Sequence, residues 1–366
     1  MNVEATSALL RHWFATELAE ADDVRVEGLD RVELGHSAET ILLTLAWSAG
    51  DDRHRSNVVL RVRPPEPGLL EPYDLEQQFR ILRALEPTPV RSPKVLWYEG
   101  TGAVLGRPFY VMECVGGTVY ERTVPDALAG APDRLRRMSQ SLVENLAAIH
   151  LVDVEATGLG FLGDGSGFLR RELDWWTSEI RRVQRGPLPA LERLCRELQA
   201  QLPEQCPTVT LVHGDAKPGN FAFENDAVSA VFDWEMTSVG DPLTDLGWAE
   251  FNWTTPGSFT SLPGSMTADE MVARYQQLTG ITVQHRDWYV ALELYKMLAI
   301  LLVAAMLFDS GASDDLRFAQ MGGAIAHYTS LALARLGVDE PLESGPVMAR
   351  EERVHEVTER QAEHAP

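Results

Sequence analysis

The feature that most constrains this chain is the stretch "HGDAKPGNFAF", residues 213–223, which lies between two segments typical of strands, "TVTLV" and "VSAVFDWE". Asp215, Lys217 and Asn220 fall within it, and Asp233 follows at the end of the next strand-like segment. Residues 224–227, three of them polar, predict a turn, so that the chain folds back as a hairpin. The sequence therefore predicts that Asp233 returns to lie beside Asn220, and that a single loop gathers these polar side chains.

These residue types match the needs of phosphoryl transfer. A carboxylate must orient the acceptor hydroxyl and take its proton, oxygen atoms must hold Mg²⁺, and cations must offset the charge on the moving phosphoryl group. Asp215 is the candidate base, Asn220 a neutral oxygen ligand and Asp233 a charged one. The alternative is a turn whose Asp, Asn and Gly residues only satisfy their own backbone.

The stretch "HGDAKPGN" followed by "FDWE" resembles the catalytic and metal-binding motifs of the aminoglycoside phosphotransferase and choline kinase superfamily. In protein kinases the metal-binding Asp opens D-F-G. Here D-W-E stands in its place, which points to the small-molecule branch. "FDWEMTSVGDPLTDLGW" is most similar to the bacterial subgroup related to the kinase-like domain of acyl-CoA dehydrogenases. The resemblance covers roughly residues 30 to 330, and three elements at matched spacing argue against a mere turn.

This resemblance implies an α+β, bilobal protein-kinase-like fold, and the residue patterns along the chain agree with it. Strand-like segments dominate the first 113 residues, and helical spacing of apolar residues dominates most of the remaining chain. We expect a small β-rich N-lobe that binds nucleotide (1–113), a larger, mainly α-helical C-lobe with the catalytic and substrate sites (114–338), and an acidic, loosely attached tail (339–366).

The resemblance also implies roles for single residues of the catalytic loop. Asp215 is expected to be the catalytic base, Lys217 to reach the γ-phosphate, and His213 to brace the loop rather than react. Asn220 and Asp233 are the expected Mg²⁺ ligands. Glu235 is expected to bind a second metal ion through water or to orient Asp233, and Asp245 to support the loop backbone from beneath.

For the nucleotide, the resemblance implies ATP, with GTP not excluded, held by residues of the N-lobe. The segment 34–40, with Gly35, Ser37 and Thr40, occupies the place of the loop that covers the phosphates. Arg61 takes the place of the lysine that usually reaches the α- and β-phosphates. Met112 would pack near the base, and the backbone from Glu113 to Val115 would hydrogen-bond its edge.

One departure from the family pattern lies in the N-lobe. Gln78 stands where a glutamate usually pairs with the phosphate-binding cation, and an amide cannot form that ion pair. Glu76 points to a different side of the predicted helix. Either Arg61 is held in another way, or the grip on phosphate is weak. In the second case the chain is a nucleotide-binding pseudokinase with a sensing or scaffolding role.

Composition narrows the range of partners. The net charge of −22, from 54 acidic and 32 basic residues, argues against nucleic acid as a partner. The same charge would attract a cationic substrate, although it is also explained by solubility alone. We expect a small-molecule substrate with a hydroxyl group: an aminoglycoside-like compound, an amino alcohol or a hydroxyacyl compound. Candidate acceptor contacts are Trp248, Glu250, Trp253 and the pair Trp175–Trp176. Packing in the hydrophobic core is the alternative for each of these tryptophans. The oligomeric state stays open.

Compartment and membrane association are also addressed by the sequence. The three cysteines show no paired spacing, which is typical of free thiols in a reducing compartment. The N-terminal residues lack a basic stretch followed by an apolar core, so we expect no secretory signal. The longest uncharged apolar run, Met297 to Phe308, is short for a bilayer span and predicts a buried helix. These features favour a cytoplasmic protein without a membrane partner.

Overall fold

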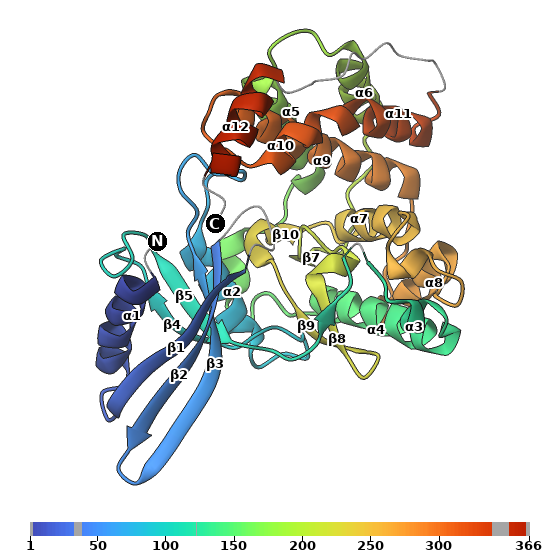
Figure 1. The fold of residues 1–366 in the computed structure, drawn as a ribbon. Coiled ribbons are helices and arrows are strands. Elements are labelled where there is room, and N and C mark those ends of the chain that lie inside the picture. The colour runs from blue at the N-terminus through green and yellow to red at the C-terminus, as the bar shows by residue number, and fades with distance from the viewer. Residues whose placement is uncertain (1–2, 33–38, 122, 339–350, 364–366) are drawn as a thin grey trace.

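Alternating apolar residues build the first part of the chain into a five-stranded antiparallel sheet of order β1-β2-β3-β5-β4 (Figure 1). This computed structural model describes residues 3–32, 39–121, 123–338 and 351–363. In β2, Ile41, Leu43 and Leu45 point to one face and are buried there. The elements of this lobe are β1 (Asp22–Val32), β2 (Glu39–Ala49), β3 (Asp52–Val62), β4 (Val95–Glu99), β5 (Phe109–Glu113), α1 (Val3–Glu17) and α2 (Leu75–Leu85).

Two N-terminal elements differ from what the residue pattern predicts. The pattern predicts one interrupted strand over residues 32–47, whereas the structure has β1 before the interruption and β2 after it. Strand β1 carries six charged residues and little apolar alternation because it lies at the sheet edge. The residue pattern also makes Ser7 a possible N-cap of the first helix. Helix α1 begins at Val3, so Ser7 lies inside the helix, and its hydroxyl donates to the Val26 carbonyl.

The C-lobe is mainly helical, as expected, and packs around the long helix α9. Its α-helices are α3 (Asp126–Ala129), α4 (Pro132–His150), α5 (Phe168–Val183), α6 (Pro189–Ala200), α7 (Leu243–Thr254), α8 (Ala268–Thr279), α9 (Arg286–Asp309), α10 (Leu316–Met321), α11 (Ile325–Arg335) and α12 (Glu351–Glu363). Its short 3₁₀ turns are η1 (Leu159–Leu162), η2 (Pro218–Asn220), η3 (Trp234–Met236), η4 (Phe259–Ser261) and η5 (Gly322–Ala324). Helix α9 contacts α5, α6, α7, α10 and α11.

Helix α9 is apolar on almost all sides because other helices surround it. Among the described helices it is long and apolar enough to cross a membrane by length and composition, but 78% of its most apolar window is buried inside the protein. The buried run predicted at Met297–Phe308 forms its second half. A helix that is hydrophobic all round and enclosed by its neighbours is the core element of the lobe.

Short strands between the lobes carry the polar loop. They are β6 (Thr118–Val119), β7 (Thr210–Val212), β8 (Phe221–Glu224), β9 (Ala227–Val231) and β10 (Ser238–Gly240). The predicted hairpin is β8–β9, with Phe221 opposite Val231, and β7 pairs with β10. Figure 1 shows these strands between the N-lobe sheet and the helices of the C-lobe. The loops that follow β7 and β9 therefore emerge side by side where the lobes meet.

The two lobes share part of one hydrophobic core. Val59 and Met112 from the N-lobe sheet belong to the same buried cluster as the C-lobe helices, while a second cluster lies between α1 and the other sheet face. Near the C-terminus, α12 packs on α10, with Val357 buried and Arg353 paired with Asp314. This part of the predicted tail is therefore held more firmly than its few apolar residues suggest.

Candidate active site

Asp215 follows β7 and makes three side-chain contacts. Its Oδ1 accepts a hydrogen bond from the indole Nε1 of Trp248 at 2.6 Å, and its Oδ2 accepts one from Asn220 Nδ2 at 2.8 Å. The Lys217 Nζ lies 3.0 Å from the same Oδ2. Burial favours the neutral acid, but Lys217, His213 and Asn220 together outweigh it and hold the pKa of Asp215 below its usual value. The carboxylate is therefore fixed in direction and ionised, as a general base requires.

His213 braces the loop through both ring nitrogens. Its Nε2 donates to the carbonyl of Phe232 at 2.9 Å, and its Nδ1 accepts from the backbone N–H of Asp215 at 3.2 Å. A carbonyl only accepts and an amide only donates, so this pattern uses the neutral imidazole protonated at Nε2. The ring joins the loop after β7 to the end of β9, and both nitrogens are occupied by backbone groups. This geometry fits a brace rather than a reacting group.

Asp245 lies beneath the loop, on the first turn of α7. Its Oδ2 accepts from the backbone N–H of His213 at 2.6 Å, and its Oδ1 accepts from that of Gly214 at 2.8 Å. His150 Nε2 contacts Oδ2 at 3.0 Å, and its Nδ1 contacts the Tyr275 hydroxyl. Burial opposes ionisation, but His150 and the backbone donors hold the pKa of Asp245 below its usual value. A wholly buried carboxylate thus anchors two consecutive amides.

The predicted metal ligands lie on neighbouring backbone segments. Asn220 ends η2 and accepts at its backbone carbonyl from the N–H of Phe232, the residue before Asp233. The side-chain Nδ2 of Asn220 is turned to Asp215, which directs its Oδ1 elsewhere. Asp233 adopts a left-handed backbone with φ of 68°. An amide oxygen and a carboxylate are hard donors that suit Mg²⁺ completed by phosphate and water.

Arg61 is held without the usual glutamate. Its guanidinium donates to the Thr40 hydroxyl at 2.9 Å and lies 3.4 Å from Asp233 Oδ1. Burial disfavours its charge, but Tyr73, Asp233 and other neighbours raise the pKa of Arg61 above its usual value. Gln78 is buried beside Tyr73 and carries no charge. Arg61 on β3 is therefore held by Asp233 of the D-W-E segment, and Gln78 does not need to pair with it.

The other predicted nucleotide contacts are only partly placed. Gly35 and Ser37 lie outside the described residues. Met112 is buried in β5, and the N–H of Glu113 donates to the Lys94 carbonyl within the sheet. Val115 follows β5 in the extended link to the C-lobe. The roles of Met112, Glu113 and Val115 toward an adenine ring stay predictions.

A cavity of about 250 Å³ opens between α5, α9, β10 and the catalytic loop. Gly214, Glu235, Glu293 and Lys296 are among the residues that line it. Glu71, Glu172 and Glu179 also line the cavity, so its carboxylates outnumber its one lysine. Burial raises the pKa of Glu293 to about 7 against the opposing effect of Lys296, and Glu172 and Asp245 raise it further. The cavity is acidic and reaches the residue before Asp215.

The candidates for acceptor contacts differ in where the structure places them. Trp175 and Trp176 line the cavity. Trp253 is core, with its Nε1 bound to the Met266 carbonyl, and Glu250 pairs with Arg286 and Arg335.

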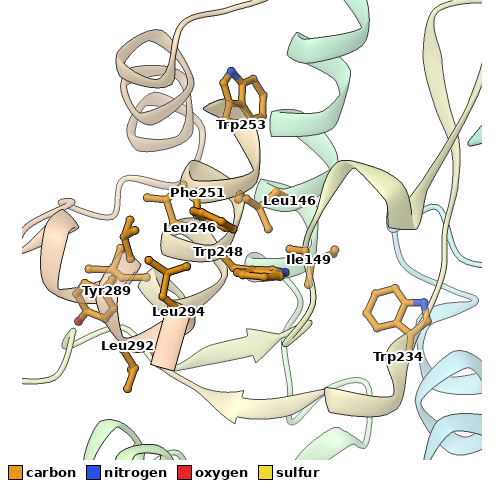
Figure 2. Close-up of a cluster of buried hydrophobic side chains, with 14 of the residues drawn as sticks. Leu146, Ile149, Trp234, Leu246, Trp248, Phe251, Trp253, Tyr289, Leu292 and Leu294 are labelled. Carbon is orange, nitrogen blue, oxygen red and sulfur yellow. The ribbon is translucent and has the colours of Figure 1, made fainter. Parts of the chain in front are cut away.

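Trp248 stacks on Phe251 in the cluster that joins α4, α7 and α9 (Figure 2). From there its Nε1 reaches Asp215, a contact that residue spacing did not reveal. Trp248 thus contacts Asp215 directly and is not among the residues that line the cavity.

Comparison with known proteins agrees with this geometry. Residues 31–290, more than half of the chain, match the phosphotransferase enzyme family (APH). The chain belongs to this family. Mouse acyl-CoA dehydrogenase family member 10 is 32% identical over 257 residues, which are 67% of this chain and 24% of that protein. Human acyl-CoA dehydrogenase family member 11 is 28% identical over 272 residues, 70% of this chain and 34% of that protein. The chain thus spans about a quarter to a third of these relatives.

Solved structures place the fold among kinase-like proteins. A proposed aminoglycoside phosphotransferase from Ralstonia eutropha JMP134 superposes with a TM-score of 0.74 at 23% identity, covering 90% of this chain and 98% of that one. A ternary complex of aminoglycoside phosphotransferase APH(4)-Ia with ADP and hygromycin B gives 0.57 at 16% identity, covering 91% and 99%. These likenesses confirm the predicted α+β, bilobal protein-kinase-like fold of this phosphotransferase family member.

Proposed function

We propose that this phosphotransferase family member is an ATP- and Mg²⁺-dependent kinase that moves the γ-phosphate to a hydroxyl group of a small molecule. The observation that carries the proposal is the way in which the partly buried carboxylate of Asp215 is held. Trp248, Asn220 and Lys217 hold it beside the backbone segment that bears Asp233. A merely structural turn has no need of three side chains that fix one carboxylate.

The chain's own residues divide the work of the transfer. Asp215 accepts the proton of the acceptor hydroxyl while the hydroxyl oxygen forms a bond to the γ-phosphorus. The bond between the γ-phosphorus and the β,γ-bridging oxygen breaks, and ADP is released. Lys217 and Arg61 offset negative charge on the phosphates. Asn220 and Asp233 would hold Mg²⁺, with Glu235 as a further candidate, and the metal when bound would neutralise charge on the β- and γ-phosphates.

The acidic cavity beside Gly214 is the best candidate for the acceptor. Its surplus of carboxylates and its two tryptophans favour a hydroxyl compound that carries an amine. The complex of APH(4)-Ia with hygromycin B lends support to this class. The names of the curated relatives favour a hydroxyacyl compound instead. Both classes therefore belong in the first test.

The test is a two-stage assay on the purified chain. Mg·ATP and Mg·GTP binding is measured by calorimetry, and ADP release is then followed over aminoglycosides, amino alcohols and hydroxyacyl thioesters. We expect binding of Mg·ATP and acceptor-dependent ADP release with at least one class. Binding without release over the whole panel favours the pseudokinase, and absence of nucleotide binding contradicts the proposal.

A further inference from the structure

A buried lysine contacts the catalytic loop at Gly214, the residue whose backbone N–H is held by Asp245. Lys296, in the middle of α9, is 6% exposed, and its Nζ donates to the carbonyl of Gly214 at 2.7 Å. The same ammonium pairs with Glu293, one turn earlier on α9, and lies 6.0 Å from the ring centre of Trp248. It therefore lies against the residue before Asp215 and near the tryptophan that binds Asp215.

The carbonyl that Lys296 holds belongs to the peptide group between Gly214 and Asp215. The N–H of the same peptide group donates to His213 Nδ1. A peptide group is planar, so fixing its oxygen and its N–H fixes its orientation and the position of the Asp215 Cα, from which the side chain extends. Gly214 has φ of 85°, and an added Cβ would lie 2.3 Å from the Met236 carbonyl oxygen. The loop is confined here to one backbone path.

Packing alone does not account for a buried ion pair at this place. Removing an ammonium and a carboxylate from water costs free energy, and apolar residues of similar size are often as good or better for stability. The rest of the buried face of α9 is largely apolar. The charged pair occurs where α9 meets the catalytic loop.

We propose that Lys296 is a positioning residue for catalysis, which helps to place Asp215 by holding the Gly214–Asp215 peptide group, while Glu293 holds Lys296 in place. This inference rests on the proposed kinase function. It assigns to α9 a part in aligning the base, in addition to its part in the core.

The test compares three variants of the full chain. Lys296→Met removes the donor, and Tyr295→Phe is the control. Lys296→Arg keeps a charged donor, and the adjoining cavity leaves space for the longer side chain. Tyr295 is the preceding residue on α9 and is buried, but its hydroxyl contacts Thr177 rather than the loop. For each variant, kcat and KM for ATP are measured with the acceptor that best supports ADP release, and amide exchange of residues 212–221 is followed by mass spectrometry.

We expect Lys296→Met to lower kcat roughly tenfold to a hundredfold, as for a misplaced catalytic group, with KM for ATP within about twofold of wild type. Exchange in residues 212–221 should be faster by about tenfold. Lys296→Arg should restore kcat and the exchange rate close to their wild-type values, and Tyr295→Phe should change neither quantity.

Two results would overturn the positioning role: an unchanged exchange rate in Lys296→Met, or an equal fall in kcat in Tyr295→Phe. If Lys296→Met fails to fold, Lys296→Arg decides, because a role in positioning predicts activity and exchange close to wild type. A wild type that binds no nucleotide overturns the kinase proposal, and the exchange measurement still decides the role of Lys296.

Discussion

Replacing Asp245 by Asn should destabilise the protein more than removal of a carboxylate that pairs only with exposed arginines. The buried Asp245 accepts hydrogen bonds from the backbone N–H groups of His213 and Gly214 and contacts His150. An asparagine keeps one acceptor oxygen and turns an NH₂ group toward the other amide, which leaves one buried N–H without an acceptor. That loss costs about 1–3 kcal/mol, and the lost charge on the remaining hydrogen bonds adds about 1 kcal/mol. We therefore expect a loss of about 2–4 kcal/mol.

The free energy of unfolding is measured by urea titration monitored by circular dichroism. The control is Asp226→Asn, which removes another carboxylate with two partners, Arg134 and Arg137, whose side chains are about half exposed. An exposed pair contributes about 0–1 kcal/mol, so the control should lose at most about 2 kcal/mol for two pairs. Equal, small losses in both variants would refute the view that Asp245 anchors the loop.

Three further predictions concern the site. Trp248→Phe removes the indole donor to Asp215 and should lower kcat by about tenfold or more in steady-state kinetics, whereas an unchanged kcat would exclude a role in orienting the base. Arg61→Met should weaken Mg·ATP binding by about tenfold to a hundredfold in calorimetry, and unchanged affinity would remove Arg61 from the phosphate site. Wild type should lose stability as the pH rises from about 4.5 to about 7, because folded Glu293 keeps a proton that the unfolded chain has already released. Glu293→Gln should lack this loss in urea titrations at several pH values, and equal pH dependence in the two proteins would contradict the raised pKa.

The sequence predicts the residues whose relation is local or fixed by one hairpin. Asp215 and Asn220 are close along the chain, and the pairing of Phe221 with Val231 returns Asp233 to them. Contacts between helices and the loop cannot be predicted from local spacing in the sequence. Trp248 reaches Asp215 across 33 residues and Lys296 reaches Gly214 across 82, and neither spacing differs from that of a core residue on a helix.

Dependence on residues that are distant in the sequence also explains the other features that the residue pattern fails to predict. Strand β1 lies at an edge and gains its partner from β2, so its charged residues need no apolar alternation. The way in which Arg61 is held without a glutamate depends on Asp233, which is 172 residues away and on the other lobe. Burial and partners set by tertiary packing decide these features, and neither is encoded in local spacing.

The most direct test of the central claim is ADP release by wild type and by Asp215→Asn, measured with saturating Mg·ATP and the best acceptor of the panel. The asparagine keeps the shape of the side chain and removes the proton acceptor. The proposed mechanism predicts a fall in kcat of about a hundredfold to ten-thousandfold while Mg·ATP affinity stays within a few-fold of wild type. Equal turnover by the two proteins would contradict it, because the transfer would then proceed without Asp215 as the base.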